Sequence, residues 1–321
     1  MKATEWQGSR WAEMVMRQAP NPTMDKKLII TACPVGSLVC RKQNPHVPHS
    51  PEEIAREAIE SYHAGATVAH LHNRDAHGNP VTRTDLLKET VDRILDECPD
   101  MVIQPSSCEG YVVGANQYTY ETVKPMVDAL HAISPRYMES TIYTPVSYAV
   151  EDVDGRIDVS LATQENTVKT VAYLQENGVK PEFMCHTWEG ILNVREWLIQ
   201  PGLLKKPYLL TMGPGMHNAA DTYPDPWGLL YVLGMMKMMP EASVVGLSAG
   251  GRNWLALTVF ALLMGVDSVR VGMEDQIWMY PHRNELISSN GEAVRKVATI
   301  ARELGREVAT AKETRALLGI G

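Results

Sequence analysis

Eight short runs of apolar, strand-forming residues alternate with helix-like segments along almost the whole chain. The runs occupy residues 27–32, 66–72, 101–104, 137–142, 182–185, 207–212, 243–247 and 267–271. Alternating strands and helices form a parallel sheet, and eight such units predict an α/β fold of the TIM (β/α)8 barrel type. A doubly wound sheet is the alternative, but no GxGxxG motif follows the first run. A barrel would place the functional site at the carboxyl ends of the strands.

The helical segments carry clear start and stop signals. Ser50-Pro51-Glu52-Glu53 has the residues of a capping box, and the helix that it opens is expected to end before Gly65. No low-complexity linker divides the later units. We therefore expect one barrel domain over residues 27–321, with its closing helices. Residues 1–26 are expected to form an N-terminal extension that wraps the barrel or meets a neighbouring subunit.

The composition excludes several classes of protein. The 321 residues are 45% hydrophobic and 21% charged, which is typical of a soluble globular chain. A net charge of −8 without a Lys/Arg run argues against a nucleic-acid partner. Residues 1–18 lack the apolar core of a signal peptide, and the apolar stretch 227–239, broken by Lys237, is too short to span a membrane. Five cysteines without CxxC spacing indicate reduced thiols in a cytoplasmic protein.

A pair of histidines ends the second run. His70 and His72 are two residues apart, so in a strand both side chains point to the same face. Neutral imidazole suits zinc and related ions, and the pair would supply half of a metal site at the barrel mouth. A strand-end histidine is also often an ordinary hydrogen-bonded residue, and this alternative stays open.

Charged residues follow the eighth run. Glu274 is the natural third ligand, because a barrel places strand eight two steps from strand two. Two histidines and one carboxylate leave an open coordination position, as in catalytic metal sites. Arg270 can hold a carboxylate bidentately, and Asp275 can act as a base beside it. An ordinary ion pair at the barrel mouth is the alternative for Arg270 and Asp275.

Further residues at strand ends are candidates for substrate binding. Ser106, Ser107 and Ser140 can donate hydrogen bonds to a substrate carboxylate, although such hydroxyls often bond to the backbone instead. Arg252 follows Gly250-Gly251 in a loop where the backbone can approach a ligand closely. Loops after the late strands often hold phosphate in this fold, although turns also need glycine.

Three segments together form a specific combination: His70-Leu71-His72-Asn73-Arg74, Ser106-Ser107 and Arg270-Val271-Gly272-Met273-Glu274-Asp275. The combination resembles the β-keto acid cleavage enzyme family. Segments 303–306, 309–311 and 315–319 resemble the closing helices of that family. The similarity runs from about Leu28 to Gly319.

The resemblance implies a TIM barrel with a divalent metal, usually zinc, held by His70, His72 and Glu274. The keto acid would chelate this metal, and Asp275 with Arg270 would remove its C2 proton. The carbanion would attack acetyl-CoA as co-substrate, and a retro-Claisen step would release acetoacetate and a new acyl-CoA. The family also implies substrate contacts from Ser106 and Ser140, and a homo-oligomer that is a tetramer.

The chain departs from the family pattern at several positions. Members that accept amino-substituted keto acids carry an acidic residue in the loop after the first strand, where this chain has Leu38. We therefore expect a substrate whose distal group is not an ammonium held there. Glu139 either lines the pocket or faces the helices. The loop 212–216 lacks the double glycine more usual in the family, so no CoA contact is assigned to it.

Two other functions remain open at this point. The first is a CoA-independent metal-dependent aldolase, lyase or hydrolase on the same barrel, which acetyl-CoA dependence would distinguish. The second is a catalytically idle barrel that serves as a binding or assembly protein. The presence of both complete sets, His70/His72/Glu274 and Arg270/Asp275, argues against an idle barrel.

Overall fold

A computed structural model describes residues 6–81, 83–107, 119–151, 155, 157–215 and 227–321. Eight parallel strands form one sheet in the order β3-β2-β1-β10-β9-β8-β7-β4. They are β1 (Ile29–Ala32), β2 (Val68–Leu71), β3 (Val102–Pro105), β4 (Ser140–Tyr143), β7 (Lys180–Cys185), β8 (Tyr208–Met212), β9 (Ser243–Leu247) and β10 (Ser268–Val271). The outermost strands of this order, β3 and β4, are joined by a hydrogen bond from Glu139 N to Ile103 O (3.0 Å). The predicted TIM barrel is confirmed.

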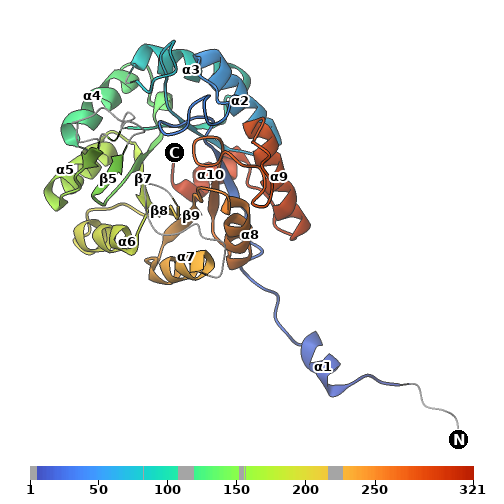
Figure 1. The fold of residues 1–321 in the computed structure, drawn as a ribbon. Coiled ribbons are helices and arrows are strands. Elements are labelled where there is room, and N and C mark those ends of the chain that lie inside the picture. Colours follow the sequence, from blue (N-terminus) through green and yellow to red (C-terminus); the bar gives the residue numbers. More distant parts are fainter. Residues whose placement is uncertain (1–5, 82, 108–118, 152–154, 156, 216–226) are drawn as a thin grey trace, which may run out of the picture.

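Helices surround the strands as an outer ring (Figure 1). They are α2 (Pro51–Ala64), α3 (Thr84–Glu97), α4 (Tyr120–His131), α5 (Gln164–Glu176), α6 (Trp188–Val194), α7 (Trp227–Met238), α8 (Trp254–Met264) and α9 (Asn290–Glu303). A 3-10 turn, η1 (Pro135–Tyr137), precedes β4, and α6 continues as a π-helical segment, η2 (Arg195–Ile199). The predicted capping box at Ser50 is present, and Gly65 ends α2.

The last helix, α10 (Ala311–Leu318), covers the amino-terminal end of the barrel. Its Leu318 packs with Ile29, Val68, Val102 and Leu209 in a small apolar cluster at this end of the barrel interior. Thr314 on α10 also hydrogen-bonds Thr67, just before β2, through their hydroxyls (2.7 Å). This end of the barrel is therefore closed by apolar packing, and the carboxyl ends of the strands are left for polar side chains.

Three elements were not expected from the sequence, and η1 is one of them, because the fourth strand was expected to start at residue 137. The other two lie outside the βα units. One is the antiparallel hairpin of β5 (Tyr148–Glu151) and β6 (Ile157–Ser160), which follows β4. The other is α1 (Arg10–Met16), which stands away from the barrel on an extended segment (Figure 1). None of the described helices is both long and apolar enough to cross a membrane. Residues 1–5 of the expected extension, and Met216 of the loop 212–216, lie outside the described residues.

Candidate functional site

The two histidines of the second strand meet at the mouth of the barrel. His70 lies in β2, and His72 follows directly after its last residue. The strand alternation turns both rings to one side, and their Nε2 atoms are 3.2 Å apart. His70 is 2% exposed, because the barrel interior encloses it. Two ring nitrogens therefore point at one small volume.

Glu274, in the loop after β10, completes this group. Its Oε1 lies 3.1 Å from Nε2 of His72 and 3.7 Å from Nε2 of His70. Gly36, in the loop after β1, makes room, because a Cβ atom there would lie 2.1 Å from Cγ of Glu274. Oε2 of Glu274 is buried and has no hydrogen-bond partner among the described residues. A buried carboxylate oxygen without a partner, beside two imidazoles, is a donor set that fits a divalent cation.

The orientation of His70 is fixed from behind by an amide. Gln104 on β3 lies opposite His70 in the strand register, and its Oε1 is 3.1 Å from Nδ1 of His70. The Gln104 Nε2 donates to Glu182 (2.7 Å) and to Ser140 (3.1 Å), so its oxygen must face the histidine. Thr211 in turn donates to Glu182 (2.5 Å). His70 therefore carries its proton on Nδ1, and the lone pair of Nε2 points toward the barrel mouth, where it can act as a ligand.

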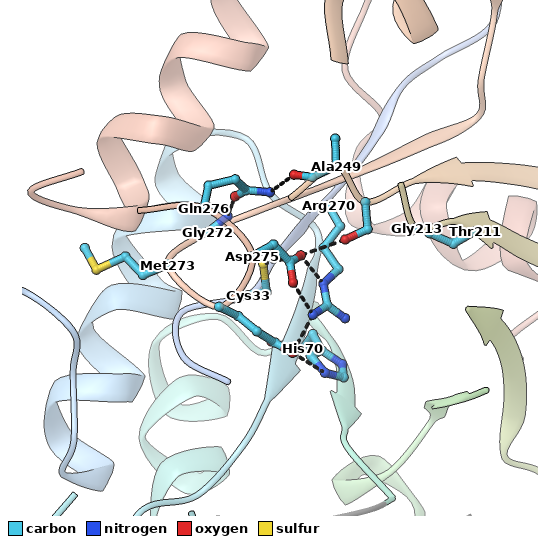
Figure 2. A network of polar contacts seen from close by, with 12 residues as sticks. Cys33, His70, Thr211, Gly213, Ala249, Arg270, Gly272, Met273, Asp275 and Gln276 are labelled. Carbon is cyan, nitrogen blue, oxygen red and sulfur yellow. Dashed lines mark hydrogen bonds and ion pairs between the residues drawn. The ribbon is translucent and has the colours of Figure 1, made fainter. Parts of the chain in front are cut away.

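Arg270 joins the two carboxylates after β10 (Figure 2). Its Nε and Nη2 donate to Asp275 at 2.7 and 2.9 Å, and Nη2 also lies 2.5 Å from Oε1 of Glu274. The Asp275 carboxylate is fully buried and accepts a further hydrogen bond from Ser248 (2.7 Å). The Cys33 thiol lies 3.5 Å from the same carboxylate oxygen. The site thus holds one carboxylate for a cation and a second, firmly positioned carboxylate beside it.

Burial and neighbouring charges set the protonation of the site. Burial, and then the charge of Arg270, hold the pKa of His70 well below its usual range. Burial alone would raise the pKa of Glu274, but Arg270 and the two histidines outweigh it and lower that pKa. The pKa of Asp275 is raised by burial, against the opposing effect of Arg270. A neutral histidine and an ionised glutamate are the forms that bind metals.

The loop that carries Glu274 is braced by a buried amide on α9. Asn290 accepts the backbone N–H of Met273 (2.8 Å) through its Oδ1 and donates to the Pro34 carbonyl (3.3 Å). Glu57 of α2, itself buried, accepts from the side chain and the backbone of Asn290 at 2.9 and 2.7 Å. The loops after β1 and β10 are therefore tied together next to Glu274.

The three predicted serine contacts lie at two different levels of the barrel. Ser106 and Ser107 follow β3 at the mouth and are buried, and the Ser107 hydroxyl donates to the Ile142 carbonyl (3.2 Å). Ser140 is the first residue of β4, so it lies farther from the mouth than the residues that end the strands. Its hydroxyl donates to the Lys180 carbonyl (2.8 Å). It reaches the histidines only through Gln104.

Two other predicted contacts lie in loops. Arg252 stacks over Trp278, with its guanidinium carbon 4.0 Å from the ring centre, and donates to the Arg283 carbonyl (2.9 Å). Leu38 is 42% exposed in the loop after β1. The turn that carries it is held by Arg74, which donates to the carbonyls of Gly36 and Val39.

Glu139 lies away from the mouth. It directly precedes β4 and is buried against Arg136 (2.6 Å) and Arg315 of α10 (2.7 Å). Burial raises the pKa of Glu139, an effect that Arg136 opposes. The sequence left open whether Glu139 lines the pocket or faces the helices, and the structure places it at the amino-terminal end of the barrel, against Arg315 of α10.

Sequence reasoning did not identify several members of the mouth network. Gln104, Glu182 and Ser248 were not among the candidates, although each contacts His70 or Asp275 directly or through one residue. The available signal was strand position, because Gln104 occupies a polar position in an apolar strand that neighbours His70.

Comparison with known proteins agrees with the motifs. Residues 27–320 match the family described as beta-keto acid cleavage enzyme. A 3-keto-5-aminohexanoate cleavage enzyme of Acetoanaerobium sticklandii is 34% identical over 296 residues, which cover 92% of this chain and 99% of that protein. A 3-dehydrocarnitine:acetyl-CoA trimethylamine transferase of Rhizobium meliloti is 28% identical over 306 residues, covering 91% of this chain and 96% of that protein.

A solved structure shares the fold. The apo structure of ObcA superimposes with a TM-score of 0.65 at 19% sequence identity. The match covers 86% of this chain and 66% of that chain, so this chain spans just under two thirds of the length of ObcA. At this level of identity the similarity shows the barrel fold alone.

Proposed function

The chain belongs to the β-keto acid cleavage enzyme family, and we propose that it condenses a β-keto acid with acetyl-CoA. The products would be acetoacetate and a new acyl-CoA. The names of the relatives support this reaction, since one is a cleavage enzyme for a 3-keto acid and the other is a transferase named for 3-dehydrocarnitine and acetyl-CoA. The protein is thus an acyl-CoA-forming acyltransferase in this proposal.

The observation that carries the proposal is the unpartnered Oε2 of Glu274 beside two histidines. His70, His72 and Glu274 would hold a divalent cation, and their nitrogen and oxygen donors favour zinc. Such a cation, when bound, supplies a Lewis acid that polarises the keto oxygen of the substrate and favours loss of the C2 proton. The position of Gln104 supports this role, because it keeps the Nε2 atom of His70 unprotonated.

Asp275 would take the C2 proton, with Arg270 as the residue that positions its carboxylate. Two hydrogen bonds from Arg270 and one from Ser248 hold the carboxylate in one orientation. General-base catalysis of this kind contributes on the order of 10² to 10⁴ in rate. Because Arg270 also contacts Glu274, the base lies directly beside the cation ligands.

The atoms balance without any further reactant. Asp275 removes one proton from C2, and the carbanion forms a bond to the acetyl carbonyl carbon, which releases the CoA thiolate. The thiolate then attacks C3, the keto carbon of the original substrate, and the C2–C3 bond breaks. C2 leaves as the enolate of acetoacetate and takes its proton back from Asp275, while the remaining acyl group departs as the new acyl-CoA.

Substrate selection would come from residues around the mouth. Ser106 and Ser107, buried beside the histidine strand, would approach the carboxylate of the keto acid. Leu38 would face its distal group, so we propose a substrate without an ammonium at that position. Arg252 is proposed as a further contact, because its loop follows β9 and its side chain is partly exposed. Ser140 is proposed to act on the substrate site through its hydrogen bond from Gln104.

The organisation of the chain also belongs to this proposal. Residues 1–26 would form an extension to a barrel of residues 27–321, and copies of the chain would assemble as a homo-oligomer, a tetramer by family resemblance. Trp6, Trp11 and Met16 support an assembly role for the extension, because all three are exposed on it. Free thiols at the described Cys33, Cys40, Cys98 and Cys185 support a cytoplasmic location.

The test is acetoacetate release from acetyl-CoA and a panel of β-keto acids with cationic, neutral, anionic or apolar distal groups. We expect release from some members of the panel and loss of release in His72→Ala. Thr141→Val is the matched control, since it removes a buried hydroxyl of β4 that bonds to the Pro105 carbonyl and not to the histidines. Turnover of a keto acid without acetyl-CoA would contradict the proposal and indicate a CoA-independent metal-dependent lyase or hydrolase.

A further inference from the structure

A cleft lies at the end of the barrel opposite the mouth. It has a volume of about 430 Å³ and lies beside Glu139 and Lys180, the residues at the start of β4 and β7. Arg136, Lys205 and Lys206 are the other charged side chains of its lining, which also includes the last residue of the sequence, Gly321. A volume of this size is within the range of small-molecule sites. The cleft shares no lining residue with the histidine site.

The three lysines of the cleft form no ion pair among the described residues, whereas its arginine does. Its one carboxylate side chain, Glu139, is already held by Arg136 and by Arg315. The Lys180 ammonium reaches only the Lys205 carbonyl, at 3.4 Å. In the described part of the chain no carboxylate lies within 4.0 Å of Lys180, Lys205 or Lys206. Three ammonium groups therefore share one cleft, in a chain whose net charge is −8.

Lys180 shows the consequence of this arrangement. It is partly buried at the floor of the cleft, and burial together with the charge of Lys205 lowers its pKa to about 8. The amino-terminal end of a barrel usually serves stability, so an unpaired cationic cleft there calls for a different explanation.

We propose that this cleft binds a small polyvalent anion of the phosphate or polycarboxylate class. Lys180 would contact the anion at the floor, and the exposed Lys205 and Lys206 would contact it from the rim. Lysine ammonium groups are point charges without a fixed fork geometry, so they accept tetrahedral and planar anions alike. This site is independent of the proposed reaction at the mouth.

The experiment is isothermal titration of the full chain with inorganic phosphate and, separately, with tricarballylate. We expect saturable binding of at least one probe, a rise of the melting temperature with that probe, and roughly tenfold weaker binding in Lys180→Met. Lys312→Met, on the exposed side of α10, is the matched control and should bind normally. Lys205→Met should weaken binding less, because that side chain is exposed.

His72→Ala separates the two sites, because it disrupts the mouth and leaves the cleft unchanged. Binding retained in His72→Ala and lost in Lys180→Met would support the cleft. No saturable binding of either probe would overturn the proposal, as would equal affinity in Lys180→Met or loss of binding in His72→Ala. A probe that raises the melting temperature of Lys180→Met as much as that of the unaltered protein would also overturn it.

Discussion

Two buried glutamates at opposite ends of the barrel have different surroundings. Glu139, before β4, has both oxygens occupied: Oε1 accepts from Arg136 and Arg315, and Oε2 accepts from Arg315 and from the Ile103 backbone. Glu274, after β10, also contacts an arginine, but its Oε2 has no partner among the described residues. Both side chains are at least 90% buried, so burial does not explain the difference.

The difference teaches how to distinguish a structural ion pair from a ligand site. A buried charge contributes to a stable fold only when its remaining lone pairs are satisfied, and Glu139 meets this condition. Glu274 does not, and an unsatisfied buried oxygen needs an explanation outside the described protein atoms. The two histidines aimed at the same volume supply that explanation, since the three together fit a divalent cation.

The largest expected effect comes from a comparison of two carboxylates, one at each end of β10, of which only Asp275 is expected to matter for kcat. Asp275→Asn keeps the shape of the site but removes the proposed base, so we expect a fall in kcat of about 10³. Asp267→Asn is the control at the other end of the strand, where Asp267 accepts from Val245 N (2.9 Å) and pairs with Lys26 (3.0 Å). It should reduce the free energy of unfolding by about 1 kcal/mol and leave kcat unchanged.

Initial rates of acetoacetate formation and denaturant unfolding of both variants check this prediction. Equal losses of kcat in Asp275→Asn and Asp267→Asn would contradict the prediction that only the carboxyl end of β10 takes part in catalysis. An unchanged kcat in Asp275→Asn would rule out its role as the base.

A second prediction concerns the amide behind His70. Gln104→Leu leaves the histidine free to turn or to place its proton on Nε2, so we expect zinc affinity to fall by about 10- to 100-fold. Thr141→Val, which removes a hydrogen bond to the Pro105 carbonyl on a neighbouring strand, should leave zinc affinity unchanged. Competition with a chromogenic chelator measures both variants. Normal affinity in Gln104→Leu would show that His70 needs no support from β3.

The smallest effect is expected at the rim. Leu38→Glu introduces a carboxylate in a partly exposed position, where a single ion pair is worth at most about 1 kcal/mol. The ratio of kcat/KM for a cationic over a neutral β-keto acid should therefore rise by about fivefold. Leu38→Gln is the uncharged control of equal size. If Leu38→Glu does not change the preference, the distal group of the substrate does not approach this loop.

The sequence was sufficient for the barrel and for the residues whose roles follow from strand position. Alternation within one strand predicted that His70 and His72 point together, and this requires no knowledge of any neighbour. The hairpin β5–β6 was missed although its strand-like residues flank Asp154-Gly155, a common hairpin turn signal.

The supporting network could not be predicted in the same way. Its members contact one another across strands, so their pairing depends on which strands are neighbours and in what register. Gln104 faces His70 only because β2 and β3 pair in the observed register. The sequence left open whether Glu139 lines the pocket or faces the helices, because its partners Arg136 and Arg315 come from η1 and α10, whose packing on the barrel the sequence does not give.

The most direct test of this account is bound zinc in Glu274→Gln and Glu139→Gln, measured by mass spectrometry after dialysis, together with denaturant unfolding of each variant. We predict that Glu274→Gln loses its zinc and remains folded, because Arg270 keeps its pairing with Asp275. Glu139→Gln should keep zinc and lose about 2 kcal/mol of unfolding free energy, because Arg136 and Arg315 then face each other unpaired. Full zinc occupancy in Glu274→Gln, or zinc loss without destabilisation in Glu139→Gln, would contradict the account.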